Sequence, residues 1–190
     1  MMKFKPATIL GLTLLMAGQA VLAKQDEVPL GAVKMKGTAS DFSAKGTDGK
    51  TYSLGQLRKN GPVFLYFIKV GCPVNGKHFQ WINEIAKFFG AQQRFVGVIN
   101  DSLAGAKTWK KEHKAPYLIL SDPELTVIGR MGVIASPWVI QIDKSGKFVQ
   151  RWQGGSKTSY KQISASMAKS LNRAVPNLAL KGAPAATETG

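Results

Sequence analysis

Residues 63–68 are six consecutive apolar residues, Val-Phe-Leu-Tyr-Phe-Ile, and this run constrains the fold more than any other feature. Side chains of a strand alternate between two faces, so an unbroken apolar run predicts a strand that is buried on both faces. Further strands are expected at 95–99, 117–120, 138–142 and 148–152, and helices at 54–59, 74–89, 103–113, 124–130 and 159–172. This alternation predicts an α/β protein with a sheet flanked by helices.

A turn signal precedes the first buried strand. The sequence Thr-Asp-Gly-Lys at 47–50 is typical of a tight turn, because Asp and Gly accept the backbone angles that such turns need. Residues 45–53 are therefore predicted to form a β-hairpin that leads into the short helix at 54–59.

The first 23 residues have the three parts of a secretory signal peptide. Lys3 and Lys5 give a positive start, residues 9–16 are mostly apolar, and residues 21–23 offer a cleavage site before Lys24. A retained membrane anchor is the alternative, but the apolar stretch is shorter than the roughly 20 residues that span a bilayer. We therefore expect a periplasmic or secreted protein after cleavage.

The mature chain is long enough for one domain with a full core and too short for two. Residues 24–38 are mixed and polar, and residues 174–190 are rich in Ala, Pro, Gly and Thr without helical or strand periodicity. We predict a mobile N-terminal segment at 24–38, one domain at 39–173 and a disordered tail at 174–190.

The chain is strongly basic, with 26 Lys and Arg against 11 Asp and Glu and a formal net charge of +15. Such a charge favours acidic partners, among them an anionic envelope surface. The lysines are spread along the chain, which is also typical of a solvated surface. No nucleic-acid-binding module is recognisable, so we expect no nucleic-acid partner.

Four segments together resemble the thioredoxin-like redoxins of the alkyl hydroperoxide reductase and thiol-specific antioxidant superfamily. They are ASDF at 39–42, DGKTYSL at 48–54, FIKVGCP at 67–73 and GVIASPWVIQIDKSGK at 132–147. The resemblance runs from about residue 39 to residue 171. It implies an α/β thioredoxin-like fold, in which helices flank a central mixed sheet and the predicted hairpin is an N-terminal extension.

Cys72 is the single cysteine of the sequence, and the resemblance places it at the position of the family's nucleophile. The predicted strand ends shortly before it and the predicted helix begins shortly after it. Free backbone N–H groups and the helix dipole favour a thiolate at such a junction, and a thiolate attacks disulfides and peroxides. Lys69 is a candidate supporting cation. Inert packing of a buried thiol is the alternative.

The resemblance also implies the residues that bind a substrate beside Cys72. Pro137 corresponds to the family's cis-proline, next to which a substrate's extended chain pairs. We therefore expect a cis Ser136-Pro137 bond, with Ser136, Pro137, Trp138 and Pro73 on the substrate side. Trp138 is expected to form one wall of the cysteine pocket.

Asn75 stands where a Cys-x-x-Cys enzyme has its second cysteine, and we count it as a supporting residue. No internal disulfide can form, so a mixed disulfide at Cys72 would need an outside thiol for its release. The partners expected are therefore a thiol or disulfide protein, or a small thiol reductant. The enzyme hypothesis is thiol–disulfide exchange or an antioxidant role through Cys72. A thioredoxin-fold module that binds partners without catalysis is the alternative.

A peroxidase that takes a peroxide and an external reductant is a further alternative. The peroxiredoxin motif would fall at Leu65, Lys69 and Cys72, where its Pro and Thr are missing, and its arginine would coincide with Pro137. Arg130 is the substitute nearby in sequence. One cysteine and two distant histidines make a poor metal-ligand set, so we expect no metal and no cofactor. His78 is expected on the helix surface.

Overall fold

The structure is a computed structural model, and it describes residues 30–90 and 94–190. The predicted signal peptide at 1–23 lies outside the described residues. The strands are β1 (Gly31–Lys34), β2 (Ser43–Gly46), β3 (Thr51–Ser53), β4 (Val63–Ile68), β5 (Phe95–Ile99), β6 (Leu118–Ser121), β7 (Trp138–Ile142) and β8 (Phe148–Gln153). The helices are α1 (Leu54–Leu57), α2 (Pro73–Phe89), α3 (Leu103–Glu112), α4 (Thr126–Arg130) and α5 (Lys157–Leu171).

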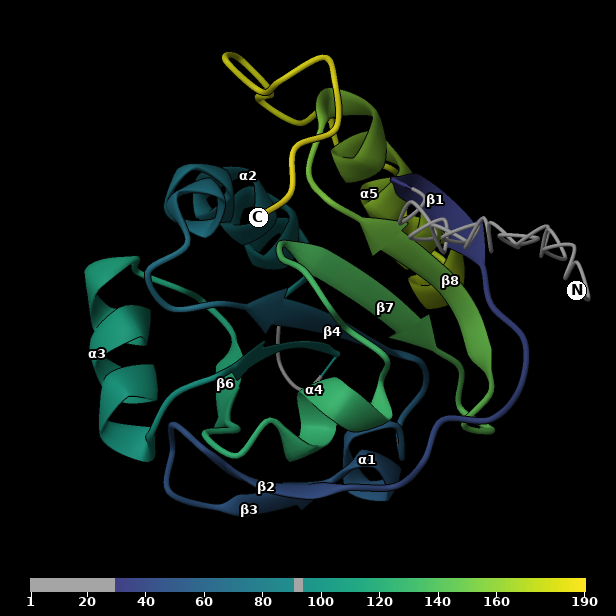
Figure 1. Cartoon of the computed structure of the whole chain (residues 1–190). Helices are drawn as coiled ribbons and strands as arrows, with labels where there is room; N and C mark the ends of the chain where they lie inside the picture. Colours follow the sequence, from purple (N-terminus) through teal and green to yellow (C-terminus); the bar gives the residue numbers. More distant parts are fainter. Residues whose placement is uncertain (1–29, 91–93) are drawn as a thin grey trace, which may run out of the picture.

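The eight strands form one sheet in the order β1-β8-β7-β4-β5-β6-β2-β3 (Figure 1). Strands β4, β5 and β6 run parallel, and the neighbours on either side run antiparallel to them. The β2–β3 hairpin forms one edge, as the turn at 47–50 predicts. The thioredoxin-like α/β fold with a mixed central sheet, expected from the sequence, is confirmed.

All six residues of β4 are buried, because helices cover both faces of the sheet. Phe64, Tyr66 and Ile68 face the core cluster shared with α2 and α5. Residues 63, 65 and 67 point the other way, into the cluster shared with α1 and α4. The alternation of side chains along one strand therefore joins the two cores.

Helix α2 begins immediately after Cys72, which is its N-cap residue, and Pro73 occupies the first helical position. Proline fits there because the first amide of a helix has no partner within the helix. The helix ends at Gly90, whose φ of 62° is in the left-handed region that favours glycine. Pro73 and Gly90 thus fix where helix α2 begins and ends, and Cys72 stands directly before its first residue.

Both ends of the domain make contacts that the local sequence patterns do not predict. Strand β1 pairs with β8 from Gly31 to Lys34, inside the predicted segment 24–38. In the tail, defined as residues 174–190, Leu180 is buried, and Leu178 and Ala183 contact the core beside α2 and α5. Apolar residues of the tail thus pack against helices that are distant in the sequence, and such contacts cannot be predicted from local patterns. No helix in the described part of the chain is long and apolar enough to cross a membrane.

Candidate functional site

The thiol of Cys72 lies at the N-terminus of α2, four residues after the end of β4. Its backbone is extended, with φ of −77° and ψ of 116°, and its side chain forms no capping hydrogen bond. The amide of Cys72 donates to the carbonyl of Lys69 at 3.3 Å, which closes the turn between strand and helix. Only 8% of the residue is exposed.

Asn75 organises the buried side of this junction. Its Oδ1 atom accepts from the amide of Lys69 at 3.0 Å and from the hydroxyl of Ser136, and its Nδ2 donates to the hydroxyl of Tyr66 at 2.9 Å. Burial raises the pKa of Tyr66, so its hydroxyl stays protonated. Asn75 thus connects α2, the end of β4 and the loop before β7, in the place where a dithiol enzyme has its second cysteine.

The loop before β7 supplies a backbone edge beside Cys72, which is buried under the tail. The Ser136-Pro137 peptide bond is cis, in agreement with the expectation from the sequence. The amide and the carbonyl of Ser136 do not pair within the sheet; both bond to Gly190 of the tail, at 2.9 and 2.8 Å. Ser136 therefore contacts both the Asn75 network and the tail.

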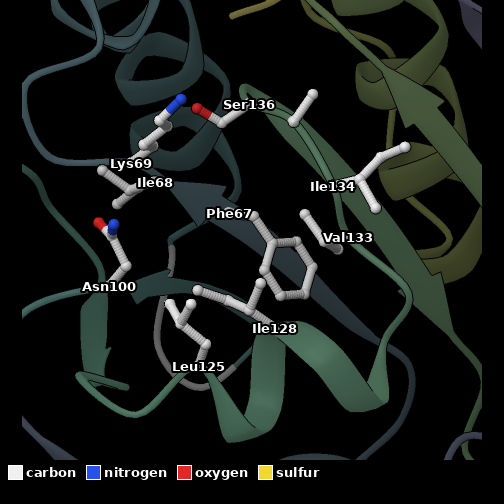
Figure 2. A pocket seen from close by; sticks show the side chains of 10 residues that line it. Phe67, Ile68, Lys69, Asn100, Leu125, Ile128, Val133, Ile134 and Ser136 are labelled. Carbon is white, nitrogen blue, oxygen red and sulfur yellow. The ribbon is translucent and has the colours of Figure 1, made fainter. Parts of the chain in front are cut away.

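An apolar pocket of about 200 Å³ is lined in part by this loop (Figure 2). Lys69 and Ser136 line it, and Asn100 accepts a hydrogen bond from the amide of Val70 at 2.8 Å. Its apolar lining is formed by Phe67, Ile68, Leu125, Ile128, Val133, Ile134 and Ala135. Lys69 is exposed at the rim, and it is a candidate contact for a bound partner.

Two of the remaining sequence-predicted residues have different surroundings. Pro73 is exposed on the first turn of α2. Trp138 is buried in the core shared with α1 and α4, and the guanidinium carbon of Arg151 lies 5.0 Å from its ring centroid. Trp138 does not line the apolar pocket beside Lys69.

His78 is fully buried, whereas the sequence analysis expects it on the helix surface. The expectation is wrong because the side of α2 that carries His78 packs against α5, where Tyr160 hydrogen-bonds the Nδ1 atom. The Nε2 atom lies 2.8 Å from the carboxylate of Glu188, in the tail. Burial lowers the pKa of His78, although the Glu188 carboxylate opposes this effect.

Gly155 makes this arrangement possible. A Cβ atom at this position would overlap both the imidazole of His78 and the hydroxyl of Tyr160. Sequence reasoning missed His78, Gly155 and Glu188 as parts of the site. The signals available were the Gly154-Gly155 pair after the last strand and a lone acidic residue, Glu188, in a tail without others.

In the part of the chain that the structure describes, no group of three or more His, Cys, Asp or Glu side chains could hold a metal ion. Arg130, the arginine considered for a peroxidase, donates to the carbonyl of Asp41 at 2.5 Å. His113 stacks on Trp109 with ring centroids 4.2 Å apart. These side chains are thus engaged in local structure.

The curated relatives are plant peroxiredoxins. Chloroplastic peroxiredoxin Q from Oryza sativa subsp. japonica is 30% identical over 115 residues, which cover 58% of this chain and 52% of the relative. The corresponding protein from Triticum aestivum is 33% identical over 107 residues, covering 54% of this chain and 48% of the relative. The chain spans about half the length of these relatives.

Solved structures with a similar fold include peroxidoxin BcpB from Mycobacterium tuberculosis. It has a TM-score of 0.58 at 23% identity, covering 74% of this chain and 97% of that one. The pneumococcal exposed lipoprotein thioredoxin from Streptococcus pneumoniae has a TM-score of 0.58 at 28% identity, covering 68% and 99%. Because peroxidoxin BcpB is only 23% identical to this chain, its similarity supports the fold alone.

The family comparison covers most of the domain and includes the whole Cys72 junction and the Ser136-Pro137 loop. The model of the AhpC/TSA family matches residues 35–151, which include strands β2 to β7 and four of the five helices. The chain therefore belongs to the AhpC/TSA family.

Proposed function

We propose that this protein is an exported thiol-dependent redox protein that exchanges its single thiol, Cys72, with disulfides of partner proteins. The observation that carries the proposal is that Cys72, without a side-chain cap, starts a 17-residue helix beside the paired backbone edge of Ser136. This arrangement supports the proposal, because it brings the proposed nucleophile next to a main-chain edge that an extended segment pairs with.

In the proposed reaction, the Cys72 thiolate attacks one sulfur of a partner disulfide. A mixed disulfide forms, and the second sulfur of the partner leaves as a thiolate. A small thiol or a second protein thiol then attacks the mixed disulfide and releases Cys72. The outside thiol is needed because the sequence contains one cysteine and Asn75 stands at the resolving position.

Peroxide reduction is the second candidate, and membership of the AhpC/TSA family together with the peroxiredoxin relatives supports it. In that reaction Cys72 would become a sulfenic acid, which an external thiol would reduce. A peroxidase needs donors that polarise the peroxide oxygens. Arg130, the arginine considered for this task, is bound to the Asp41 carbonyl, so we favour disulfide exchange.

One experiment separates these candidates. The chain is treated with oxidised glutathione or with hydrogen peroxide, and mass spectrometry follows glutathionylation and dimedone-trapped sulfenate at Cys72. We expect glutathionylation about tenfold faster than that of an unstructured cysteine peptide, because thiolate character and access control the rate. The C72S variant lacks the thiol and serves as the blank. The E188Q variant repeats the test with a tail that is expected to be held less tightly, because it lacks the carboxylate that contacts Lys77 and His78.

Three other results have distinct meanings. Faster sulfenate formation than glutathionylation would favour the peroxidase. Reaction no faster than the peptide in both the native chain and E188Q would contradict both redox candidates and leave a partner-binding module.

Export is tested separately, by expressing the chain in a bacterium with a periplasm and sequencing the N-terminus of the periplasmic product. An uncleaved product in the cytoplasm would contradict the proposed export.

A further inference from the structure

Residues 187–190, which we name the tail strand, pair through main-chain groups with two segments beside Cys72, the one that follows β8 and the loop before β7. Glu188 exchanges two main-chain hydrogen bonds with Gly155, at 2.8 and 3.0 Å. Gly190 exchanges two more with Ser136, at 2.8 and 2.9 Å. In Figure 1 the tail leaves α5, loops outward and returns to end next to α2. Main-chain pairing at alternate residues is how extended peptides bind to a sheet edge.

Side-chain contacts fix the position of the tail strand along this edge. Lys77 Nζ lies 3.0 Å from both carboxylate oxygens of Glu188, and His78 Nε2 lies 2.8 Å from one of them. Among residues 30–90 and 94–190, the one ion pair formed by a lysine or arginine is Lys77–Glu188, and the imidazole of His78 contacts the same carboxylate. The chain has 26 basic and only 11 acidic residues, and Lys77 and His78 together hold one of those acidic side chains at a fixed position.

The third contact places residue 190 against the thiol. A Cβ atom built on Gly190 would lie 3.1 Å from Cys72 Sγ and 3.3 Å from Val74 Cγ2. In a disulfide, a Cβ atom lies about 3 Å from the sulfur of the other residue, because the S–S bond is about 2.05 Å long. The tail strand therefore has the register in which a cysteine at position 190 would reach Cys72.

From these three contacts we propose that the tail strand occupies a substrate site, and that the site selects extended protein segments with an acidic residue two positions before a disulfide-bonded cysteine. The acidic side chain binds Lys77 and His78, the backbone pairs with Gly155 and Ser136, and the cysteine meets Cys72. This inference rests on the proposed exchange function and adds its substrate class.

The first test measures the register. In G190C, Cys72 is converted to its mixed disulfide with 5-thio-2-nitrobenzoate; the introduced thiol attacks it, expels the coloured thiolate and closes an internal disulfide. We expect closure in G190C to be at least about tenfold faster than in T189C, because adjacent side chains of an extended strand point to opposite faces. Equal rates in the two variants, or closure that is faster in T189C, would overturn the proposed register.

The second test measures selection, in a variant that lacks residues 184–190 so that the edge is open. Its Cys72 is reacted with the peptides Thr-Glu-Thr-Cys and Thr-Lys-Thr-Cys, each as its 5-thio-2-nitrobenzoate disulfide and with blocked ends. We expect the acidic peptide to form the mixed disulfide with Cys72 about tenfold faster. The K77E substitution should reverse that preference, since it places a carboxylate beside the bound peptide side chain.

The outcomes separate this inference from the proposed function. Rapid reaction of both peptides at equal rates would keep disulfide exchange and overturn the selection of acidic segments. Reaction of neither peptide faster than a free cysteine would overturn disulfide exchange itself. Circular dichroism of the shortened variant checks that its domain remains folded, and G190C in the full chain tests the register if it does not.

Discussion

The Nε2 atom of His78 lies 2.8 Å from a carboxylate oxygen of Glu188, so a fully buried histidine of α2 contacts the tail 110 residues later. Because a carboxylate only accepts hydrogen bonds, Nε2 carries a proton. Burial lowers the pKa of His78 and so favours the neutral ring, in which Nδ1 accepts from the Tyr160 hydroxyl. This assignment is that of a neutral imidazole. The tail is thus held by the same histidine that joins α2 to α5.

Replacing Glu188 by Gln should loosen the tail strand and expose Cys72. The substitution removes the charge that pairs with Lys77 and His78 while keeping the shape of the side chain. We expect the rate of Cys72 alkylation by iodoacetamide to rise severalfold at pH 7, measured by mass spectrometry. Glu124, which is exposed and outside the tail, provides the control E124Q. An unchanged rate in E188Q would mean that this ion pair does not govern access to the thiol.

Acidification should destabilise the protein through His78. Burial lowers the pKa of His78 in the folded state, so the unfolded chain binds a proton more readily. Stability is therefore complete above the ordinary histidine pKa of about 6.5 and is lost as the pH falls from there toward the folded-state pKa. The unfolding free energy from urea titrations between pH 7.5 and 5 should decrease.

The E188Q variant sharpens this pH test. Glu188 opposes the lowering of the His78 pKa, so its removal should deepen the loss of stability between pH 6.5 and 5. Glu188 itself has a lowered pKa because His78 and Lys77 bond to its carboxylate; its contribution is therefore lost only in more acidic solution, as the pH falls through that pKa. Identical pH profiles for the native chain and E188Q would contradict coupling between the two residues.

Replacing Asn75 by Ala should cost about 2–3 kcal/mol of unfolding free energy, because it leaves buried hydrogen-bonding groups without partners. The groups affected are the Tyr66 hydroxyl, the Ser136 hydroxyl and the amide of Lys69. Urea denaturation compares N75A with N60A, since Asn60 is exposed. Equal, small losses in both variants would show that the Asn75 network contributes little to stability.

Gly155 should tolerate no side chain. An added methyl group in G155A would overlap His78 and Tyr160, and relieving that overlap in a filled core is expected to cost about 2–3 kcal/mol. At Gly129, in α4, a Cβ atom meets nothing within 4 Å, so G129A should keep or slightly raise stability. Thermal unfolding of both variants tests this; a G155A midpoint like that of G129A would refute the close approach.

Local sequence patterns predict the fold well where burial is continuous. The bounds of β4, β5 and β7 agree with the sequence prediction, because strands covered on both faces are mostly apolar; Gln141 in β7 is the polar exception. Helix α2 begins one residue earlier than its periodicity indicates, since Pro73 is a favourable first residue. The position of Cys72 between them follows from these two elements.

Contacts between distant segments explain what the sequence does not predict. His78 lies in the same stripe as Ile82 and Ile85, yet its polar ring is typical of a helix surface, and its partner Tyr160 is 82 residues away. The tail has no periodicity, because its pairing with Ser136 and Gly155 uses main-chain groups that every residue carries. Such pairing leaves no local mark in the sequence.

The tail strand is held by four main-chain hydrogen bonds and the Glu188 carboxylate, while the domain beneath it shares two large apolar cores. Segments with few buried apolar contacts open locally at much lower free energy than the whole domain. The amides of Glu188 and Gly190 should therefore exchange with solvent deuterium well before those of β4. The rate measured at Cys72 is then the product of the opening equilibrium constant of the tail strand and the intrinsic rate constant of the exposed thiol. A small shift in the opening equilibrium therefore changes the apparent reactivity without any change at the sulfur.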